Sequence, residues 1–246
     1  MFRAAVVIPV YDHDLHIAAL VDVLLNLQLP CVLVDDGSGS ACARTLDAIA
    51  ALHPEHVSLV RHDANQGKGG AVLSGIARAA ELGFTHALQI DADGQHDTND
   101  VELFLSLARA NPGALVTGQP RFDASVPRVR LYLRYLTHFM VCVNTLTPTL
   151  RDAMCGFRVY PVQKILELSR QVSLGRRMDF DIEVLVRLDW AQVPIILQPT
   201  RVRYPLDGVS HFRLVADNAR ITSLHTRLFF SMLLKAPKLL RHRRPA

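Results

Sequence analysis

Two aspartates one residue apart, Asp91 and Asp93, are the residues whose type and spacing most directly suggest chemistry. They stand in residues 88–97, which read Leu-Gln-Ile-Asp-Ala-Asp-Gly-Gln-His-Asp. Alternation along an extended chain places both carboxylates on one side, where they repel each other unless a cation lies between them. Mg²⁺ and Mn²⁺ take oxygen ligands of this kind and share them with phosphate oxygens. For the pair taken alone, the alternative is a polar turn with an aspartate capping the next helix.

Two other polar segments could contact a nucleotide. Residues 35–38 read Asp-Asp-Gly-Ser, and a carboxylate there could accept hydrogen bonds from a base or ribose, although a β-turn with a helix cap is an equal alternative. Residues 65–70 read Asn-Gln-Gly-Lys-Gly-Gly and are not a P-loop, because Lys68 is followed by glycine. Their glycines would let backbone amides approach an anion at a helix N-terminus, next to the charge of Lys68. A flexible turn is the alternative reading.

Arginines dominate the charge that follows residue 120. Arg128, Arg130 and Arg134 occur with no acid between residues 127 and 150, which favours an anionic ligand over an ordinary solvated helix face. Asp181 and Glu183 stand near the start of a predicted helix and are expected to cap it, with a general base as the second reading. The histidines show no metal-ligand pairing.

The composition is that of a globular protein. The chain has 246 residues, 50% of them hydrophobic, and a formal net charge of +4. Residues 235–246 contain five lysines and arginines and no acid. The four cysteines have no metal-binding spacing and are expected to be reduced. No signal peptide and no apolar stretch of membrane-spanning length is recognised, so a cytoplasmic location is expected.

Apolar patterns predict the elements that must position these residues. Strands are expected at residues 3–10, 31–34, 57–60, 86–90 and 114–117, alternating with helices at 15–29, 41–52, 71–82 and 98–110. This alternation is typical of an α/β, Rossmann-like, doubly wound and mostly parallel sheet with helices on both faces. The polar clusters all follow strands, and ligands of such sheets bind at the carboxyl ends of strands. The sequence therefore predicts a ligand site within the first 121 residues.

The pattern changes after residue 128. Helices are expected at residues 129–146, 161–171, 180–190 and 214–234, with a polar link at 151–160 and an edge strand at 193–204. We expect a catalytic domain over residues 1–212 and a C-terminal helical extension over 213–246. Residues 231–240 and their basic neighbours suggest an amphipathic segment on a membrane surface, with a disordered basic end as the alternative. No motif for nucleic acid accompanies this charge.

Five segments, in this order, resemble the family 2 glycosyltransferases of GT-A fold, and most of all the polyprenyl-phosphate (dolichyl-phosphate) sugar synthases. They read Ile-Pro-Val-Tyr, Val-Asp-Asp-Gly-Ser, Asn-Gln-Gly-Lys-Gly, Asp-Ala-Asp-Gly-Gln-His and Asp-Ala-Met-Cys-Gly-Phe-Arg, and they begin at residues 8, 34, 65, 91 and 152. The resemblance covers about residues 4–215.

The resemblance implies a role for each matching residue. The nucleotide sugar would be bound by Pro9, Tyr11, Asp12, Asp35, Asp36, Lys68, Asp91 and Asp93. A Mn²⁺ or Mg²⁺ ion on the donor diphosphate would be held by Asp91, Asp93 and Gln95. The residues implied for catalysis are Asp93, Arg121, Arg134, Asp152 and Arg158, the last two on the acceptor side. The acceptor phosphate would be gripped by Arg130 or Arg134, with Ser210 and His211, where the family often has Ser-Lys.

The expected function is therefore an inverting, metal-dependent transfer of a hexose from a nucleotide-diphosphate sugar to a polyprenyl phosphate or other lipid-linked acceptor. The enzyme would lie at the inner face of a membrane. The Cys-Gly-Phe form of residues 155–157 points to UDP-glucose over GDP-mannose. One alternative keeps the fold but takes a non-phosphate hydroxyl acceptor, with Asp181 or Glu183 as base. A second is a non-catalytic nucleotide-binding protein.

Overall fold

A single sheet of seven strands organises the computed structural model, which describes residues 1–121, 128–150, 152–202 and 213–242. The strand order is β3-β2-β1-β4-β6-β5-β7. The strands are β1 (Ala4–Val10), β2 (Cys31–Asp35), β3 (Val57–Arg61), β4 (His86–Gln89), β5 (Leu115–Arg121), β6 (Arg158–Pro161) and β7 (Ile195–Arg201).

The sheet is parallel except at β6, which runs antiparallel to both β4 and β5. The predicted doubly wound, mostly parallel sheet is confirmed, and β7 lies at an edge as expected. The predicted polar link at residues 151–160 ends earlier than expected, because β6 begins at Arg158 in the middle of the sheet. A four-residue strand that opens with a charge and closes with Pro161 shows no strand pattern. Arg158 is tolerated there because it donates to the backbone carbonyls of Asp181 and Ala153, at 2.7 and 2.8 Å.

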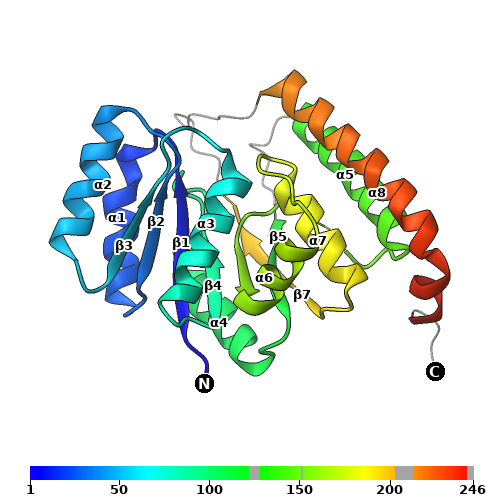
Figure 1. Cartoon of the computed structure of the whole chain (residues 1–246), viewed down its shortest axis with the longest axis horizontal. Helices are drawn as coiled ribbons and strands as arrows, with labels where there is room; N and C mark the ends of the chain where they lie inside the picture. The colour runs from blue at the N-terminus through cyan, green and yellow to red at the C-terminus, as the bar shows by residue number, and fades with distance from the viewer. Residues whose placement is uncertain (122–127, 151, 203–212, 243–246) are drawn as a thin grey trace.

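Helices cover both faces of the sheet, as Figure 1 shows. Successive residues of β1 point to opposite faces, so Val6 and Ile8 join one hydrophobic cluster while Ala5 and Val7 join the other. The first face carries α1 (Asp14–Asn26), α2 (Ser40–Leu52) and α4 (Val101–Ala110), the last preceded by the 3₁₀ turn η1 (Thr98–Asp100). The second face carries α3 (Lys68–Glu81), α6 (Val162–Gln171) and α7 (Phe180–Trp190).

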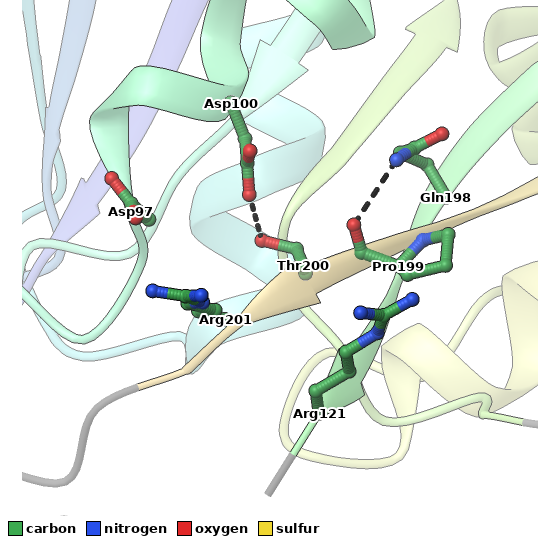
Figure 2. A pocket seen from close by; sticks show the side chains of 7 residues that line it. All are labelled: Asp97, Asp100, Arg121, Gln198, Pro199, Thr200 and Arg201. Atoms are coloured by element: carbon green, nitrogen blue, oxygen red, sulfur yellow. Dashed lines mark hydrogen bonds between the residues drawn. The ribbon is translucent and has the colours of Figure 1, made fainter.

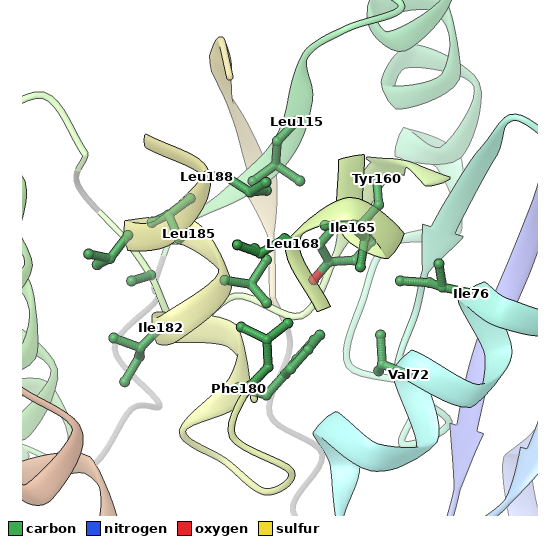
Figure 3. Packing of buried hydrophobic residues seen from close by; sticks show 14 of the residues in the cluster. Val72, Ile76, Leu115, Tyr160, Ile165, Leu168, Phe180, Ile182, Leu185 and Leu188 are labelled. Atoms are coloured by element: carbon green, nitrogen blue, oxygen red, sulfur yellow. The ribbon is translucent and has the colours of Figure 1, made fainter. Parts of the chain in front are cut away.

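The core of the second face is built around α7. Its apolar side chains Ile182, Leu185 and Leu188 lie among residues of α3, α6 and the sheet (Figure 3). Phe180, at the start of α7, packs closely on α3. A Cβ built at Gly69 would lie 2.4 Å from the Cβ of Phe180. Helix α3 can therefore begin at Lys68, three residues before the predicted start, because glycine leaves room for this contact.

Two long helices, α5 (Arg128–Thr145) and α8 (Leu214–His242), lie side by side at one end of the molecule (Figure 1). The predicted end of the last helix at residue 234 is wrong, because α8 continues through Pro237 to His242. Met232 and Leu239 are buried in the same cluster as α7, with Ala236 packed beside them, so the apolar spacing that holds the helix does not stop at residue 234. In the described residues, neither helix is long and apolar enough to cross a bilayer.

Candidate active site

Polar side chains gather at the carboxyl ends of the parallel strands. Tyr11 and Asp12 follow β1, Asp36 follows β2 and Asp91 follows β4. Strand β6 runs the other way, so its first residue, Arg158, pairs with Gln89 at this same edge. The reversed strand thereby brings residues 152–157 to the site that the first half of the chain builds.

Lys68 is at the centre of this site. Its ammonium lies 2.8 Å from Oδ2 of Asp91 and 3.1 Å from Oδ2 of Asp181. Burial alone would lower the pKa of Lys68, but the charges of Asp181 and Asp91 outweigh it and raise that pKa above its usual value. Gly156 passes directly beneath: a Cβ there would lie 2.5 Å from Lys68 Nζ and 2.6 Å from Asp91 Oδ2. The glycine is needed for the lysine and the carboxylate to meet.

The two aspartates of the Asp-Ala-Asp segment have different environments. Burial acts to raise the pKa of Asp91, but Lys68 and then His96 outweigh it and hold that pKa well below its usual range. Burial, followed by the charge of Asp91, raises the pKa of Asp93, although its Oδ1 accepts a 3.0 Å hydrogen bond from the backbone N–H of Gln95. Two adjacent carboxylates of which one is disfavoured as an anion are a place where an additional cation is stabilised.

The chemical type of the side chains in this segment suits a hard divalent cation. Asp91, Asp93 and the amide of Gln95 offer oxygen ligands, which Mg²⁺ and Mn²⁺ prefer. Within the described ranges no three His, Cys, Asp or Glu side chains are grouped as a metal site, and the carboxylates of this segment are Asp91 and Asp93. An ion held there would complete its coordination with ligand or water oxygens.

His96 is a site residue that the sequence interpretation missed. Its Nε2 lies 3.6 Å from Oδ2 of Asp91, and its ring stacks on Phe157 with centroids 5.3 Å apart. The signal was its place directly after Gln95. The sequence shows no second metal ligand at a recognised spacing from this histidine, and its partner in the structure is the carboxylate of Asp91.

Asp12 and Asp35, two of the acidic residues expected to bind the nucleotide sugar, also hold the loops around the site. Asp12 Oδ1 accepts from the N–H of Gly39 at 2.7 Å, and Asp35 forms a 2.8 Å ion pair with Arg61. The pKa of Asp35 is lowered: burial acts to raise it, but hydrogen bonds from Ser38 and the Arg61 pair prevail. The first bond fixes the ends of β1 and β2 relative to each other, and the ion pair fixes the end of β2 to the end of β3.

Asp36 anchors the glycine-rich turn before α3. Its carboxylate accepts from the N–H groups of Gln66 and Gly67, both at 2.8 Å, and hydrogen-bonds His62 at 2.8 Å. Gly67 has φ +94°, a conformation that favours glycine, and the backbone of Arg176 and Arg177 packs against it. The turn that carries Lys68 is therefore held in place from two sides.

Arg121 and a second arginine line a cavity of about 370 Å³ beside this edge (Figure 2). The parallel register of β5 and β7 pairs Arg121 with Arg201, and the two guanidinium groups lie on the same cavity as Asp97 and Asp100. Neither arginine forms an ion pair with another described residue, whereas Asp100 is bound by Thr200 at 2.6 Å. Sequence reasoning found Arg121 but missed Arg201, whose only signal was a charge at the end of an alternating edge strand.

Arg134 and Asp152 form a bidentate ion pair, with Nε–Oδ2 at 2.6 Å and Nη2–Oδ1 at 2.8 Å. Asp152 also accepts from the N–H groups of Met154 and Cys155, at 2.9 and 3.1 Å. The pair links α5 to the segment that leads into β6. These two residues, expected on the acceptor side, are brought together and satisfy each other.

Three other residues differ in how near they lie to the surface of the site. Arg158 is fully buried beneath it and holds backbone carbonyls. Of the two proposed bases, Asp181 lies at the site, bound to Lys68. Glu183 is fully buried, where it accepts from the Gly175 N–H and pairs with Arg187, both at 2.7 Å. Asp181 is therefore the one carboxylate of this pair that could reach a ligand.

The remaining predicted residues are placed only in part. Pro9 and Tyr11 are half-buried at the end of β1 and just beyond it. The side chain of Arg130 and both residues of the Ser210-His211 pair lie outside the described part of the chain. Their roles at the acceptor phosphate stay predictions.

Known proteins resemble this chain in sequence and in fold. The model of a family described as "Glycosyl transferase family 2" matches residues 5–168. A dolichyl-phosphate beta-glucosyltransferase of Dictyostelium discoideum is 25% identical over 211 residues, which cover 78% of this chain and 63% of that protein, less than two thirds of its length. A polyprenol monophosphomannose synthase of Mycolicibacterium smegmatis is 25% identical over 195 residues, 73% of this chain and 70% of that protein. A glucosyl-3-phosphoglycerate synthase of Mycobacterium tuberculosis, solved with Mn²⁺, UDP-glucose and phosphoglyceric acid, has a TM-score of 0.69 at 15% identity over 93% of this chain and 80% of its own.

Proposed function

The chain belongs to glycosyl transferase family 2 and is a glycosyltransferase of GT-A fold, and we propose that it transfers a hexose from a nucleotide-diphosphate sugar to a polyprenyl phosphate. Curated relatives carry the names of dolichyl-phosphate and polyprenol-phosphate sugar transferases, which supports this acceptor class. The family membership argues against the alternative of a non-catalytic nucleotide-binding protein.

The observation that carries the choice of acceptor is the pairing of charges at the site. Asp181, the candidate base that could reach a ligand, is bound to Lys68, and Asp152 on the acceptor side is paired with Arg134, so both carboxylates are engaged. Arg121 and Arg201 have no ionic partner among the described residues. Such a site suits an acceptor that is already an anion, because a phosphate needs positive charge and no general base.

The proposed reaction needs no proton transfer. A phosphate oxygen of the acceptor attacks the anomeric carbon of the sugar, the bond from that carbon to the diphosphate oxygen breaks, and its electron pair leaves with the nucleoside diphosphate. Attack opposite the leaving group inverts the anomeric carbon, so an α-linked donor gives a β-linked product. Arg121 and Arg201 would bind and orient the attacking phosphate.

The leaving diphosphate requires positive charge of its own. Mn²⁺ or Mg²⁺ at Asp91, Asp93 and Gln95 would neutralise the charge that develops on it. The neighbour solved with Mn²⁺ and UDP-glucose supports a metal of this kind. Lys68 fixes the orientation of Asp91 and adds a point charge beside the phosphates. Asp12, Asp35 and Asp36 would shape the nucleotide site through the loops they hold.

Three buried or paired residues are proposed to act by positioning. Arg134 and Asp152 hold residues 152–157 against α5, and Arg158 holds the start of α7 through the Asp181 carbonyl. These contacts set Gly156 beneath Lys68 and place Asp181 at its ammonium.

The basic end of α8, with Lys235, is proposed to hold the protein at a membrane surface.

The experiment that tests the donor is a panel of UDP-glucose, UDP-N-acetylglucosamine and GDP-mannose, each with Mn²⁺ and farnesyl phosphate. We expect label from one of these donors to appear in an acid-labile, β-linked phosphodiester, and expect EDTA and Asp93→Ala to abolish it. UDP-glucose is the first candidate, from the Cys-Gly-Phe segment at residues 155–157. Full transfer by the Asp93→Ala variant with its fold intact would overturn the metal assignment.

A further inference from the structure

Helix α5 exposes a stripe of large apolar side chains that nothing in the described protein covers. Tyr132, Tyr135, Leu136 and Phe139 are 73%, 67%, 59% and 62% exposed. At 3.6 residues per turn these four positions fall within an arc of about 100° on the helix. The stripe is therefore one continuous face about two turns long. Single exposed apolar residues are common on protein surfaces, whereas a continuous exposed apolar face marks an interaction site.

The opposite side of the same helix faces the protein. Thr137, Val141 and Asn144 are buried, and Asn144 accepts a 2.9 Å hydrogen bond from the indole of Trp190 through its backbone carbonyl. Arg134 lies on the side away from the stripe, where its guanidinium binds Asp152. Helix α5 thus separates an outward apolar face from an inward face that reaches the acceptor side of the site.

Charge on α5 and α8 indicates what covers this stripe. Helix α8 packs against α5, as Figure 1 shows, and the two helices together carry eight lysines and arginines but one acid, Asp217. That acid is itself paired with Arg220 at 2.9 Å. The basic residues are Arg128, Arg130, Arg134, Arg220, Arg227, Lys235, Lys238 and Arg241. Two such helices would repel a second copy of themselves and attract an anionic surface.

We propose that the α5 stripe inserts into the interfacial region of an anionic phospholipid bilayer. Tyrosine rings with an apolar body and a polar tip suit the headgroup boundary, and Leu136 and Phe139 would reach deeper. The basic residues of α8 contribute attraction to anionic headgroups. This rests on the proposed function, since it sets the arginines of the site beside the membrane that would contain a polyprenyl phosphate.

Vesicle sedimentation tests the insertion without any donor or acceptor. Wild-type protein is mixed with phosphatidylcholine vesicles that contain either no or about 30% phosphatidylglycerol. We expect binding to the anionic vesicles, and a loss of at least about tenfold in partition for Leu136→Gln/Phe139→Gln. The matched control is Leu52→Gln/Leu103→Gln, which removes two exposed leucines from α2 and α4 on the other face of the sheet and should leave partition unchanged.

The remaining outcomes decide between this surface and others. Equal partition of Leu136→Gln/Phe139→Gln and wild type, or no binding of the wild type to anionic vesicles, would overturn the proposal. A dimeric wild type that this variant makes monomeric would assign the stripe to a second copy instead. Vesicle binding with no sugar transfer would leave the surface standing and reject the proposed acceptor, so the two failures are distinguishable.

Discussion

The ammonium of Lys68 lies 2.8 Å from Oδ2 of Asp91, and this contact joins the glycine-rich turn before α3 to the carboxyl end of β4. Residues from two separate strand–helix connections are thereby held in one site. Asp181, from the second half of the chain, completes the contact at 3.1 Å. The first half of the chain supplies the donor side, and the segments around β6 and α7 close it.

Removing the lysine should destabilise the protein. In Lys68→Met two carboxylates lose their shared partner, and breaking a largely buried pair in this way costs about 2–3 kcal/mol after allowance for its partial exposure. Urea unfolding measures this free energy. Adding Asp181→Asn to Lys68→Met should restore part of the loss, because one uncompensated charge is removed. A Lys68→Met variant as stable as the wild type would show that the ion pairs do not hold these segments together.

Gly156→Ala should separate activity from folding. A Cβ at this position would lie too close to both Lys68 Nζ and Asp91 Oδ2, so both side chains must shift. We expect transfer to fall about 100-fold, since small displacements at a site have effects of this size. The matched control is Gly113→Ala, where a Cβ meets nothing within 4 Å. Unchanged transfer by Gly156→Ala would mean that the Lys68–Asp91 contact is not needed for the reaction.

Arg201→Ala should affect the acceptor more than the donor. Loss of one charge-assisted contact to a phosphate corresponds to about a tenfold or larger rise in the KM for polyprenyl phosphate. The KM for the nucleotide sugar should change less than twofold. Arg44→Ala, an exposed arginine on α2, serves as the charge-matched control. An equal rise in both KM values would place Arg201 on the donor side or in the fold alone.

The free energy of unfolding should decrease as the pH is lowered, because one buried histidine becomes protonated when the protein unfolds. His225 is buried between α5 and α8, 3.1 Å from the Asn144 amide nitrogen, and burial lowers its pKa to about 4. The unfolded chain binds this proton at about pH 6.5, so the free energy of unfolding should decrease as pH falls from about 6.5 to 4 and then level off. The unfolding midpoint should change less with pH across this range for His225→Gln than for the wild type or the exposed control His56→Gln. Parallel profiles for all three would contradict a buried neutral His225.

Much of the site could be predicted from the sequence because its residues follow apolar strands. Asp91, Asp36 and Arg121 each stand at the end of such a run, and parallel strands bring those ends to one edge. Arg201 and His96 were missed for a different reason. Arg201 meets Arg121, 80 residues away, through the β5–β7 register, which no local pattern encodes. His96 lies only five residues from Asp91, but their contact is not one of the recognised spacings of metal ligands.

The fold shows the same division. The strands and helices of the first 121 residues follow regular apolar periods and were predicted closely. Strand β6 was not, because Arg158 and Pro161 are poor strand residues, and burial against α7 and pairing with β4 and β5 make the segment extended. The extension of α8 beyond residue 234 likewise depends on tertiary contacts of Leu239, which outweigh the effect of Pro237.

The most direct test of the central proposal, an acceptor that is already an anion, is the ratio of transfer to farnesyl phosphate and to farnesol under identical donor and Mn²⁺ concentrations. The two acceptors share the same chain and differ only in the phosphate. The pairing of Asp152 and Asp181, with Arg121 and Arg201 left unpaired among the described residues, predicts transfer at least about 1,000-fold faster to the phosphate. Comparable rates for the two acceptors would contradict it and would make Asp181 a general base.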